Sequence, residues 1–471
     1  MPLLLAPYAP LILSLIHLGL AVAVTLHVLA NKRDPGSAVA WIGLAWLAPV
    51  IGSVLYLLLG INRVRRRARG MGRAPVDERV IEATPGPPGC QHLAGLELAA
   101  RRISRRNLQS GNAVQMLRNG DAAYPLMIAA IDSAATSVGL SSYIFRTDGI
   151  GRQFITALQR AQQRGVAVRV LIDGYGGGYL RSASYRALHR AGIAVARFMH
   201  SALPWRMPFL NLRTHRKILC VDGRIGFTGG LNIGDENLVA AQPRHTVLDT
   251  HFRFEGPVVA QLAEAFAGQW QFATGESLTG PAWYPPLTAA GDSLVRVVTS
   301  GPDQDLEKIE FLVLEALACA RSSVQIMTPY FLPDDRIIAA LALAAMRNVA
   351  VDLVLPDHSN HPSVDWAMRA HIGPMLTAGC RIWTHPAPFD HSKLMSVDDI
   401  WCFIGSANWD LRSFRLNFEI NLEVYQSDLV EQVRARIATN QITPLTQADL
   451  DRRGLPARLR DNAAHLLLPY L

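Results

Sequence analysis

The apolar positions of this chain form two long runs at the N-terminus and much shorter runs afterwards. No charged residue occurs from Met1 to Ala30 or from Ser37 to Asn62. Each run supplies the ~20 apolar residues that a helix needs to cross a bilayer. A secretory signal peptide would begin with a positively charged region, which this chain lacks, and a second apolar run would not follow at once. We therefore expect residues 1–62 to form a two-helix transmembrane hairpin, with spans at about 9–30 and 37–61.

A basic segment follows the second apolar run. It contains six arginines, whereas the short turn between the runs has only Lys32 and Arg33; the six are Arg63, Arg65, Arg66, Arg67, Arg69 and Arg73. The positive-inside rule then predicts that the arginines, the N-terminus and the rest of the chain lie in the cytoplasm. Beside a membrane, this cluster and the net charge of +8 favour anionic lipid headgroups over nucleic acid as the partner. Residues 63–96 are expected to form a basic juxtamembrane segment and linker.

Beyond the linker, helical and strand patterns alternate, and their order occurs twice. The first set predicts helices at 122–135 and 151–164 and strands at 137–145 and 166–173. The second set predicts helices at 308–320 and 336–347 and strands at 324–329 and 349–356. Such a repeat indicates duplication of an α/β domain. We expect a first domain at 97–280 and a second at 281–471, each a mixed sheet flanked by helices, with a pseudo-twofold axis between them.

A short motif occurs once in each predicted domain. His215-Arg-Lys217-Ile-Leu-Cys-Val-Asp222 and His391-Ser-Lys393-Leu-Met-Ser-Val-Asp398 share the form H-x-K-x-x-x-x-D and lie 176 residues apart. Asn232 and Asn408 each follow their His by seventeen residues. His and Lys two apart on a strand point to the same face, and the next strand would bring the Asn back to them. The two copies together predict a cationic, donor-rich pocket for a phosphate diester.

Other site chemistries fit these residues poorly. A single His-x-Lys would indicate only a solvated strand face, but the repetition argues against that interpretation. A metal site is disfavoured because an ammonium group cannot coordinate a metal and no Cys or carboxylate cluster accompanies either motif. The five cysteines show neither zinc-site nor disulfide-framework spacing. The sequence therefore predicts no metal and no other cofactor.

With these motifs the chain resembles the phospholipase D superfamily, and its wider sequence resembles bacterial cardiolipin synthases with two membrane spans. The resemblance extends over nearly the whole chain and includes Ser142–Phe145, Gly165–Asp173, Asp249–Arg253, Pro329–Phe331 and Asp410–Glu419. It implies an α/β fold of two phospholipase D-type domains with the active site at their interface.

The resemblance also implies roles for the motif residues. One His attacks phosphorus and forms a phosphohistidine, while the other protonates the leaving alkoxide and later deprotonates the incoming alcohol. The family suggests His215 as nucleophile and His391 as general acid and base, although the near-symmetry of the halves leaves this order open. The amine and amide groups would hold the non-bridging oxygens of the phosphate; they belong to Lys217, Lys393, Asn232 and Asn408.

Each reactive His needs a partner that fixes its tautomer. Glu419 stands at the offset from His391 where the superfamily has this carboxylate, whereas the same offset from His215 falls on Pro243. The resemblance therefore assigns Glu419 to the second half and Asp249, after a longer loop, to the first.

Four further residues are candidates for the site. Asp222 and Asp398 complete the motifs as candidate catalytic residues, although their place at strand-end turns favours a structural role. Tyr143 and Tyr330, at matching places in the two halves, are candidates to line the substrate site. The sequence does not define the oligomeric state, and an oligomer is compatible with it.

The predicted function is a cardiolipin synthase reaction in a bacterial inner membrane. A phosphatidyl group would pass between two phosphatidylglycerol molecules through a phosphohistidine, giving cardiolipin and glycerol. The alternative is hydrolysis of a phospholipid or, less favoured, of nucleic acid, because a phosphodiesterase would share the same residues. A non-enzymatic scaffold is disfavoured because His, Lys and Asn are intact in both motifs.

Overall fold

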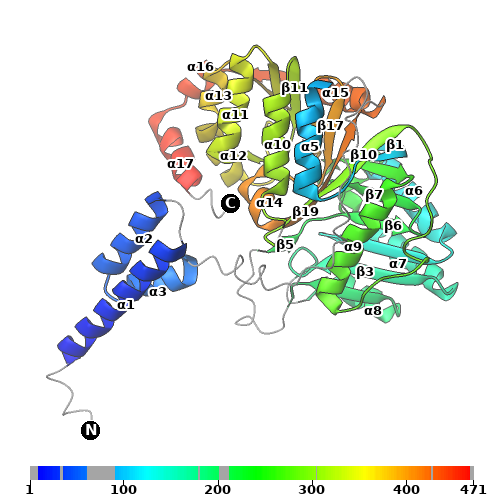
Figure 1. Cartoon of the computed structure of the whole chain (residues 1–471), viewed down its shortest axis with the longest axis horizontal. Coiled ribbons are helices and arrows are strands. Elements are labelled where there is room, and N and C mark those ends of the chain that lie inside the picture. Colours follow the sequence, from blue (N-terminus) through cyan, green and yellow to red (C-terminus); the bar gives the residue numbers. More distant parts are fainter. Residues whose placement is uncertain are drawn as a thin grey trace, which may run out of the picture. The chain divides into compact units, whose positions relative to one another are not determined.

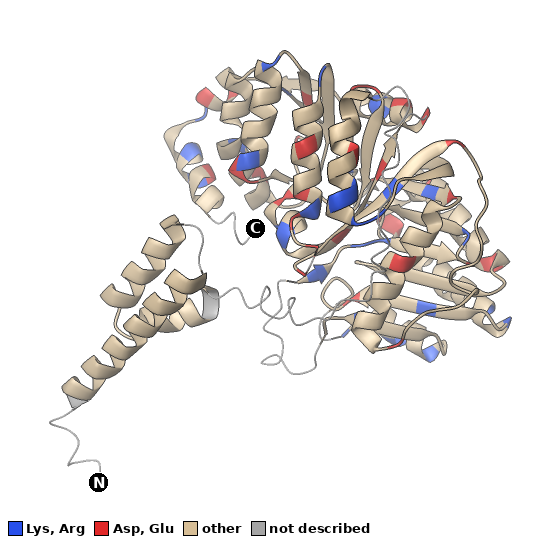
Figure 2. Cartoon of the chain, viewed as in Figure 1, with Lys and Arg blue, Asp and Glu red and all other residues tan. Residues whose placement is uncertain are grey.

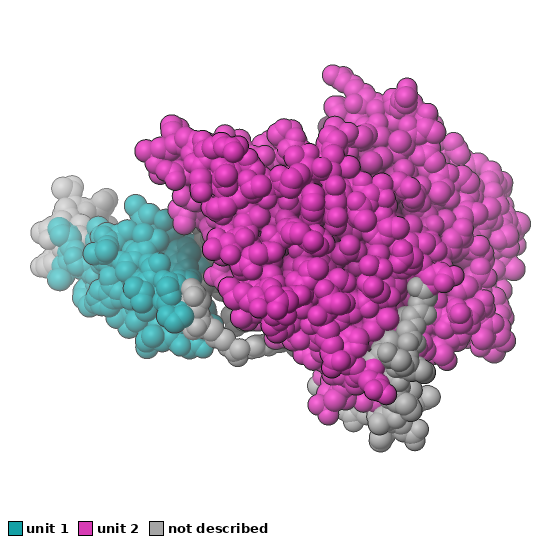
Figure 3. All heavy atoms as spheres, turned by 90° about the horizontal axis from the view of Figure 1, so that it is seen from above, with its two compact units in different colours: residues 1–71 teal, residues 72–471 magenta. Residues whose placement is uncertain are grey.

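The structure is a computed structural model that describes residues 9–31, 35–60, 91–178, 181–200, 212–303, 305–425 and 428–466. The chain divides into two compact units, residues 1–71 and 72–471, which Figure 3 distinguishes by colour. The arginine cluster at 63–73 and most of the predicted linker lie outside the described residues.

The first unit contains the two apolar runs. The first run forms α1 (Ala9–Asn31), and the second forms α2 (Pro35–Leu47), α3 (Ile51–Leu55) and the single turn η3 (Tyr56–Gly60). Neither α1 nor α2 carries a charged side chain (Figure 2). Val24, Val28, Ala45 and Tyr56 form a small buried core between these helices. His27 Nδ1 lies 2.7 Å from the Tyr56 hydroxyl, so this polar group in the first run serves a helix contact.

Among the described residues, only α1 is long and apolar enough to cross a membrane. The second continuous span predicted at 37–61 is not confirmed. Helix α2 has 13 residues, or ~20 Å at 1.5 Å per residue, which is less than the ~30 Å of a bilayer core. Pro49 follows it without a backbone N–H, and Val50 takes a φ of 61°, so the helix cannot continue into α3.

The second unit is built on one mixed 16-stranded sheet (Figure 1). From the antiparallel pair β1–β10 at its centre, the strand order outward is the same on both sides: β1-β9-β7-β6-β2-β3-β4 and β10-β19-β17-β16-β11-β13-β14, after which β20 follows. The first-half strands are β1 (Gln109–Arg118), β2 (Ser137–Ser142), β3 (Ala167–Asp173), β4 (Ala194–Phe198), β6 (Ile218–Val221), β7 (Ile225–Gly229) and β9 (Thr250–Glu255). The second-half strands are β10 (Ser293–Ser300), β11 (Ser323–Met327), β13 (Ala350–Pro356), β14 (Arg381–His385), β16 (Leu394–Val397), β17 (Trp401–Gly405), β19 (Asn417–Tyr425) and β20 (Thr443–Leu445). The matching orders show two repeated mixed-sheet domains, here called the first and second half, joined through one sheet.

Helices cover both faces of this sheet. The first half has α6 (Asn119–Ser133), α7 (Gly149–Gln163), α8 (Ala183–Arg190) and α9 (Val258–Thr274); the second has α10 (Lys308–Cys319), α11 (Asp335–Met346), α12 (Pro362–His371), α13 (Gly373–Thr377), α14 (Leu411–Arg415), α15 (Asp428–Thr439), α16 (Gln447–Asp451) and α17 (Leu455–Leu466). The four predicted helices correspond to α6, α7, α10 and α11. Helices α9 and α15 share one apolar core with strands of both halves, whereas α6 and α7 form a separate core in the first half. The shared core explains why the two halves form one compact unit rather than two.

Helix α5 (Ala94–Ser104) departs from the expected arrangement, in which the first domain begins at residue 97. Figure 1 shows it beside α10, and its Leu96 and Ala100 belong to the apolar core of the second half. The chain therefore adds a helix to the second half before it enters the first. A short turn, η4 (Gln91–Leu93), precedes α5.

Candidate active site

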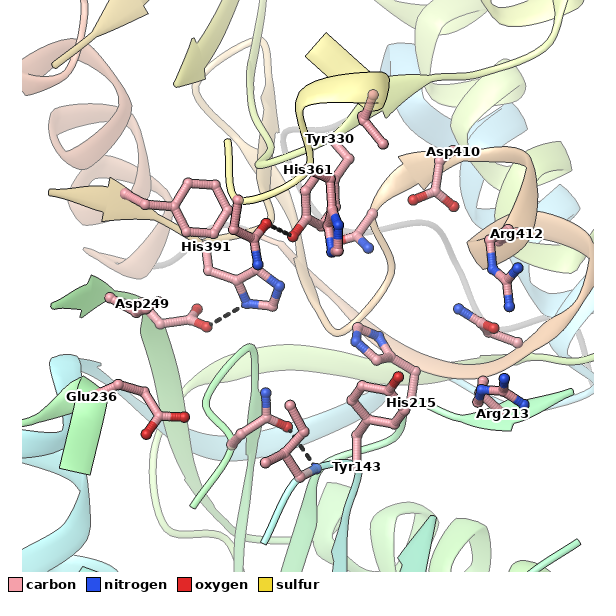
Figure 4. Close-up of a pocket in the computed structure, with 18 of the residues that line it drawn as sticks. Tyr143, Arg213, His215, Glu236, Asp249, Tyr330, His361, His391, Asp410 and Arg412 are labelled. Atoms are coloured by element: carbon pink, nitrogen blue, oxygen red, sulfur yellow. Dashed lines mark hydrogen bonds and ion pairs between the residues drawn. The ribbon is translucent and has the colours of Figure 1, made fainter. Parts of the chain in front are cut away.

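A cavity of about 690 Å³ lies between the two halves and is lined by residues of both. Seven of the predicted site residues line it: Tyr143, His215, Asn232, Asp249, Tyr330, His391 and Asn408. Figure 4 shows the two histidines facing the same space from opposite sides. The structure thus brings the two motifs together, and the chemical roles of their residues remain predictions.

Two short parallel pairings place the histidines. Strand β5 (Arg213–Thr214) pairs with the start of β19, and the His215 backbone N–H donates to the Phe418 carbonyl at 2.9 Å. In the same way β15 (Phe389–Asp390) pairs with β8 (Val247–Leu248), and the His391 N–H donates to the Leu248 carbonyl at 2.7 Å. His215 and Lys217 therefore lie between β5 and β6, not within the regular strand that their spacing predicted.

The two carboxylates predicted to orient the histidines each contact the histidine of the other half. His215 Nδ1 lies 3.1 Å from Glu419 Oε2, and His391 Nδ1 lies 2.9 Å from Asp249 Oδ2 (Figure 4 shows the second contact). The assignment of Glu419 to His391 and of Asp249 to His215 is therefore wrong. The reason is the pairing just described, because Glu419 directly follows Phe418 and Asp249 directly follows Leu248.

The tautomer of His215 is determined by its neighbours. Its Nδ1 lies 3.1 Å from both Glu419 Oε2 and the Ser406 carbonyl oxygen, which are acceptors, so Nδ1 carries the hydrogen and Nε2 keeps its lone pair. Burial lowers the pKa of His215, which favours the neutral ring. Burial would raise the pKa of Glu419, but nearby His215 and Lys217 and a bond from Ser406 hold that pKa below its ordinary value. A neutral imidazole with an ionised partner is the form required of a nucleophile.

His391 has a different electrostatic environment. Burial, followed by the charges of Lys393 and Lys217, lowers the pKa of His391 well below its ordinary value. Lys393 Nζ lies 2.7 Å from the same Nδ1 that contacts Asp249. Burial raises the pKa of Asp249, so this carboxyl supports a charged imidazole less strongly than Glu419 does. The two histidines are thus chemically unequal despite their symmetric placement.

A serine and a glycine at matching positions contribute to this difference. Ser406 Oγ donates to Glu419 Oε2 at 2.5 Å. Gly230 occupies the matching place in the first half, where a Cβ atom would lie only 2.0 Å from Asp249 Oδ1. The first half therefore has no room at this position for a hydroxyl that could stabilise Asp249 as Ser406 stabilises Glu419.

Both motif lysines are buried behind the cavity wall. Lys217 Nζ donates to the His215 carbonyl at 2.8 Å, and Lys393 Nζ donates to the His391 carbonyl. Burial lowers the pKa of Lys217 to about 7 and that of Lys393 to about 8. An anion bound between the histidines would favour the protonated form of both amines.

The remaining lining groups shape a small polar centre. The ring centroids of His215 and His391 lie 6.4 Å apart, so both imidazoles border the space that one phosphate group would occupy. Tyr143 packs edge-on against His215 and Tyr330 against His391. Asn232 Oδ1 accepts from the Ile144 N–H at 3.1 Å, which leaves its amino group as a donor. Within the described residues, no group of three or more His, Cys, Asp or Glu side chains is placed to hold a metal ion.

Asp222 and Asp398 have structural roles, contrary to their inclusion among the catalytic candidates. Asp222 accepts the backbone N–H groups of residues 135, 136 and 137, where α6 leads into β2. Asp398 accepts those of residues 321, 322 and 323 at the matching place before β11. Strands β6 and β16 separate these carboxylates from the histidines, so they fix strand ends rather than contact a substrate.

Several lining residues were not assigned a role from the sequence. They are Arg146, Arg213, Glu236, His361, Asp410 and Arg412. A comparison of the two motif copies for differences, rather than for identities, would have revealed three of them. Arg213 stands two residues before His215, whereas Phe389 stands two residues before His391. Arg412 in the second half corresponds to Glu236 in the first half.

Comparison with known proteins agrees with this architecture. Residues 127–270 and 313–440 match the family model described as "Cardiolipin synthase, PLD-like domain", and residues 19–60 match "Phospholipase_D-nuclease N-terminal". The chain is 32% identical over 460 residues to a cardiolipin synthase of Geobacillus kaustophilus, covering 95% of this chain and 91% of the relative. It is 30% identical over 469 residues to cardiolipin synthase 1 of Bacillus anthracis, covering 96% and 92%.

A solved structure supports the fold. The phosphatidylserine synthase of Haemophilus influenzae superposes with a TM-score of 0.59 at 13% identity, covering 80% of this chain and 100% of that one. This likeness supports the fold alone, while the family is shown by the family model and by the relatives that match nearly the whole length of this chain. This chain belongs to the cardiolipin synthase family of the phospholipase D superfamily.

Proposed function

We propose that this protein is a cardiolipin synthase, which transfers a phosphatidyl group from one phosphatidylglycerol to another and releases glycerol. The observation that carries the proposal is the pair of imidazoles 6.4 Å apart, each with Nδ1 bonded to a buried carboxylate. This geometry suits a two-step displacement at one phosphorus, in which donor and acceptor lipids bind in turn.

In the first step, the lone pair of His215 Nε2 forms a bond to phosphorus while the bond from phosphorus to the glycerol oxygen breaks. His391 gives a proton to that oxygen, and glycerol leaves. The phosphate anion between the rings opposes the effect of Lys393 and allows His391 to hold this proton. Glu419 stabilises the positive charge that the phosphorylated His215 ring acquires.

In the second step, a hydroxyl of the second phosphatidylglycerol gives its proton to His391. Its oxygen attacks phosphorus, the N–P bond breaks, and cardiolipin forms. The amides of Asn232 and Asn408, which line the cavity, stabilise the charge on the non-bridging oxygens in both steps, and the buried amines of Lys217 and Lys393 add their positive charge from behind the cavity wall. No cofactor enters this scheme.

Hydrolysis is the alternative reaction, because water could replace the second hydroxyl without any other change. The apolar N-terminal unit, with one helix long enough to cross a membrane, favours a lipid substrate over nucleic acid.

The test supplies purified full-length protein with labelled phosphatidylglycerol in mixed micelles and resolves the products. Cardiolipin and free glycerol in equal amounts are expected, and phosphatidic acid without cardiolipin would exclude a synthase. His215→Ala and His391→Ala should each abolish product formation. His465→Ala, the same change on α17, is the matched control because its imidazole contacts His371 rather than the cavity.

We also propose that the N-terminal unit is a membrane hairpin with a broken second arm and that the catalytic unit faces the cytoplasm of a bacterial inner membrane. The arginines after the second apolar run support this orientation through the positive-inside rule. The test is a reporter fused after residue 471, whose activity depends on the side of the membrane that it occupies. A fusion that is active only in the cytoplasm agrees with the proposal, and activity only in the periplasm would contradict it.

A further inference from the structure

The two ends of the cavity are related by the pseudo-twofold repeat but differ in charge. Arg213 matches Phe389, and Arg412 matches Glu236; in each pair the positions are 176 residues apart, like the two motif histidines. Figure 4 shows Arg213 and Arg412 together on the side of His215 away from His391, with Glu236 on the other side of the site. One end is thus built from two guanidinium groups and the other from an aromatic ring and a carboxylate.

The contacts of the two arginines place them beside the reacting centre. The Arg213 guanidinium lies over the Tyr175 ring, 4.1 Å from its centroid. Burial and Asp173 raise the pKa of Tyr143, and the charges of Arg213 and Arg412 oppose this increase, so both cations lie near the ring that packs on His215. Arg412 belongs to the first turn of α14, which follows Asp410 directly.

The ionisable groups that line each end determine its charge. Among the described residues, the one carboxyl that lines the arginine end is that of Asp410, which accepts the Ser413 N–H at 2.6 Å as the N-cap of α14, and burial raises its pKa. At the other end Glu236 is bonded to Arg146 at 2.8 Å, which leaves a neutral pair. Two guanidinium groups and one carboxyl therefore line the arginine end, while the carboxyl groups of Asp173 and Glu419 lie behind the lining.

We propose that Arg213 and Arg412 form a second anion subsite, which binds the phosphate of the acceptor phosphatidylglycerol. This inference rests on the proposed function. Both lipids carry a phosphate, but only the donor phosphate can lie between the histidines, so the acceptor phosphate needs another site one glycerol length away. Paired guanidinium groups suit it because each can bind two phosphate oxygens. A cavity of about 690 Å³ has room for both headgroups.

A neighbouring amide adds a contact for the glycerol between the two phosphates. Asn417 lines the same cavity and is only 7% exposed. Its Oδ1 has no hydrogen-bond partner among the described residues, while its Nδ2 donates to Glu419 Oε1 at 3.2 Å. A glycerol hydroxyl could donate to this oxygen and satisfy it.

The test compares two soluble acceptors that differ only in a phosphate, glycerol and glycerol 3-phosphate. Each acceptor carries a label and is given with unlabelled phosphatidylglycerol as the donor, so that transfer yields labelled phosphatidylglycerol or labelled phosphatidylglycerophosphate. Each transfer breaks the N–P bond, forms a P–O bond and passes the hydroxyl proton to the general base. Wild-type protein should use glycerol 3-phosphate at much lower concentration than glycerol.

Arg213→Gln and Arg412→Gln should each reduce the preference for glycerol 3-phosphate by roughly 10- to 100-fold, since each removes charge-assisted hydrogen bonds. Cardiolipin formation should fall in parallel, while transfer to glycerol stays within about threefold of wild type because it does not use the subsite. Arg146→Gln, which removes a cavity arginine paired with Glu236, is the matched control and should not change the ratio of the two acceptors.

The outcomes separate this inference from the proposed function. Equal loss with both acceptors would overturn the subsite, since the arginines would then serve the donor phosphate or the fold. An unchanged preference would also overturn it. Failure of the wild-type protein to form cardiolipin from phosphatidylglycerol would instead refute the proposed function, whatever the variants do.

Discussion

Glu419 of the second half accepts a hydrogen bond from His215 of the first half at 3.1 Å. Asp249 and His391 form the reciprocal contact at 2.9 Å. Each motif imidazole therefore contacts a carboxylate from the other half of the molecule, and these His–carboxylate pairs exist only where the halves meet. The site depends on the shared core beneath it, to which α9 and α15 contribute.

The exchanged pairs allow the roles of the histidines to be separated. Glu419→Gln should slow formation of the phosphohistidine by about 10²- to 10⁴-fold, because an amide cannot hold His215 in the tautomer that leaves Nε2 free. The measurement is rapid quenching with a phosphatidyl ester of p-nitrophenol labelled in its phosphate, followed by detection of the acid-labile, base-stable adduct. This leaving group departs without protonation.

Asp249→Asn is the matched control for this measurement. The substitution changes the hydrogen-bond partner of His391. The activated ester reacts in the first step without protonation by His391, so adduct formation should remain close to the wild-type rate. Transfer of the adduct to an alcohol should be slow, because that step needs His391 as a base. The reverse pattern, with the adduct lost only in Asp249→Asn, would make His391 the nucleophile.

The motif lysines predict a pH dependence of anion binding. Burial lowers the pKa values of Lys217 and Lys393 to about 7 and about 8. An anion binds the protonated amines better, so its affinity should be highest below pH 7 and fall as the pH rises through 7 to 8. The slope should approach about tenfold per pH unit for each proton taken up on binding. Inhibition by tungstate, measured between pH 6 and pH 9, provides the test.

Lys217→Met and Lys393→Met serve as controls for this titration. Each should weaken tungstate binding at pH 6 and flatten its pH dependence, since one titrating group is removed. An inhibition constant that does not change between pH 6 and pH 9 in the wild-type protein would show that the amines do not titrate in this range.

The sequence predicted the repeated elements well because each half carries its own local signals. The helices expected at 151–164 and 308–320 correspond to α7 (Gly149–Gln163) and α10 (Lys308–Cys319), and the strand at 349–356 corresponds to β13 (Ala350–Pro356). The motif spacing also predicted that His215 and His391 lie at one site, and both line the cavity. These features depend on residues close in sequence, whose periodicity is visible without the tertiary structure.

The sequence could not predict contacts that depend on how the halves meet. The offset from His391 to Glu419 indicates a carboxylate, but the β5–β19 pairing decides which histidine it reaches. Likewise the apolar face of α5 shows that the helix is buried, not which half covers it. Hydropathy alone did not predict that the helix of the second apolar run, α2, ends just before Pro49.

The structural assignment of Asp222 and Asp398 predicts effects on stability rather than chemistry. Asp222→Ala removes the acceptor of three backbone N–H groups and should lower the free energy of unfolding by about 1–3 kcal/mol. The carboxylate has a lowered pKa because its backbone hydrogen bonds outweigh the opposing effect of burial. Its contribution is therefore present above the pKa of the unfolded chain and is lost as the pH falls through the lower pKa of the folded protein.

The check is the thermal midpoint of the full-length variant together with its turnover per folded molecule. Asp398→Ala should behave in the same way, because its backbone contacts repeat those of Asp222, and it also loses a contact with His92 at 2.9 Å. A loss of turnover comparable to that of His215→Ala, with an unchanged thermal midpoint, would restore a catalytic role to these carboxylates.

The packing of α5 against the second half predicts that breaking one buried ion pair strongly lowers the free energy of unfolding. Arg296 of β10 and Glu423 of β19 are both fully buried and bonded to each other, and Arg296 also reaches Glu97 of α5 at 3.5 Å. Glu423→Ala leaves the guanidinium buried without its main partner and should cost about 3–5 kcal/mol. Glu97→Ala should cost less, because its contact is longer and Glu423 remains.

A double replacement, Arg296→Met with Glu423→Met, should have a free energy of unfolding closer to that of the wild type than Glu423→Ala has, since no unpaired charge is left. Chemical denaturation of the wild-type protein, the two single variants and the double variant measures the order of their free energies of unfolding. A double variant less stable than Glu423→Ala would mean that the charges themselves, rather than the filled volume, hold α5 and the two strands together.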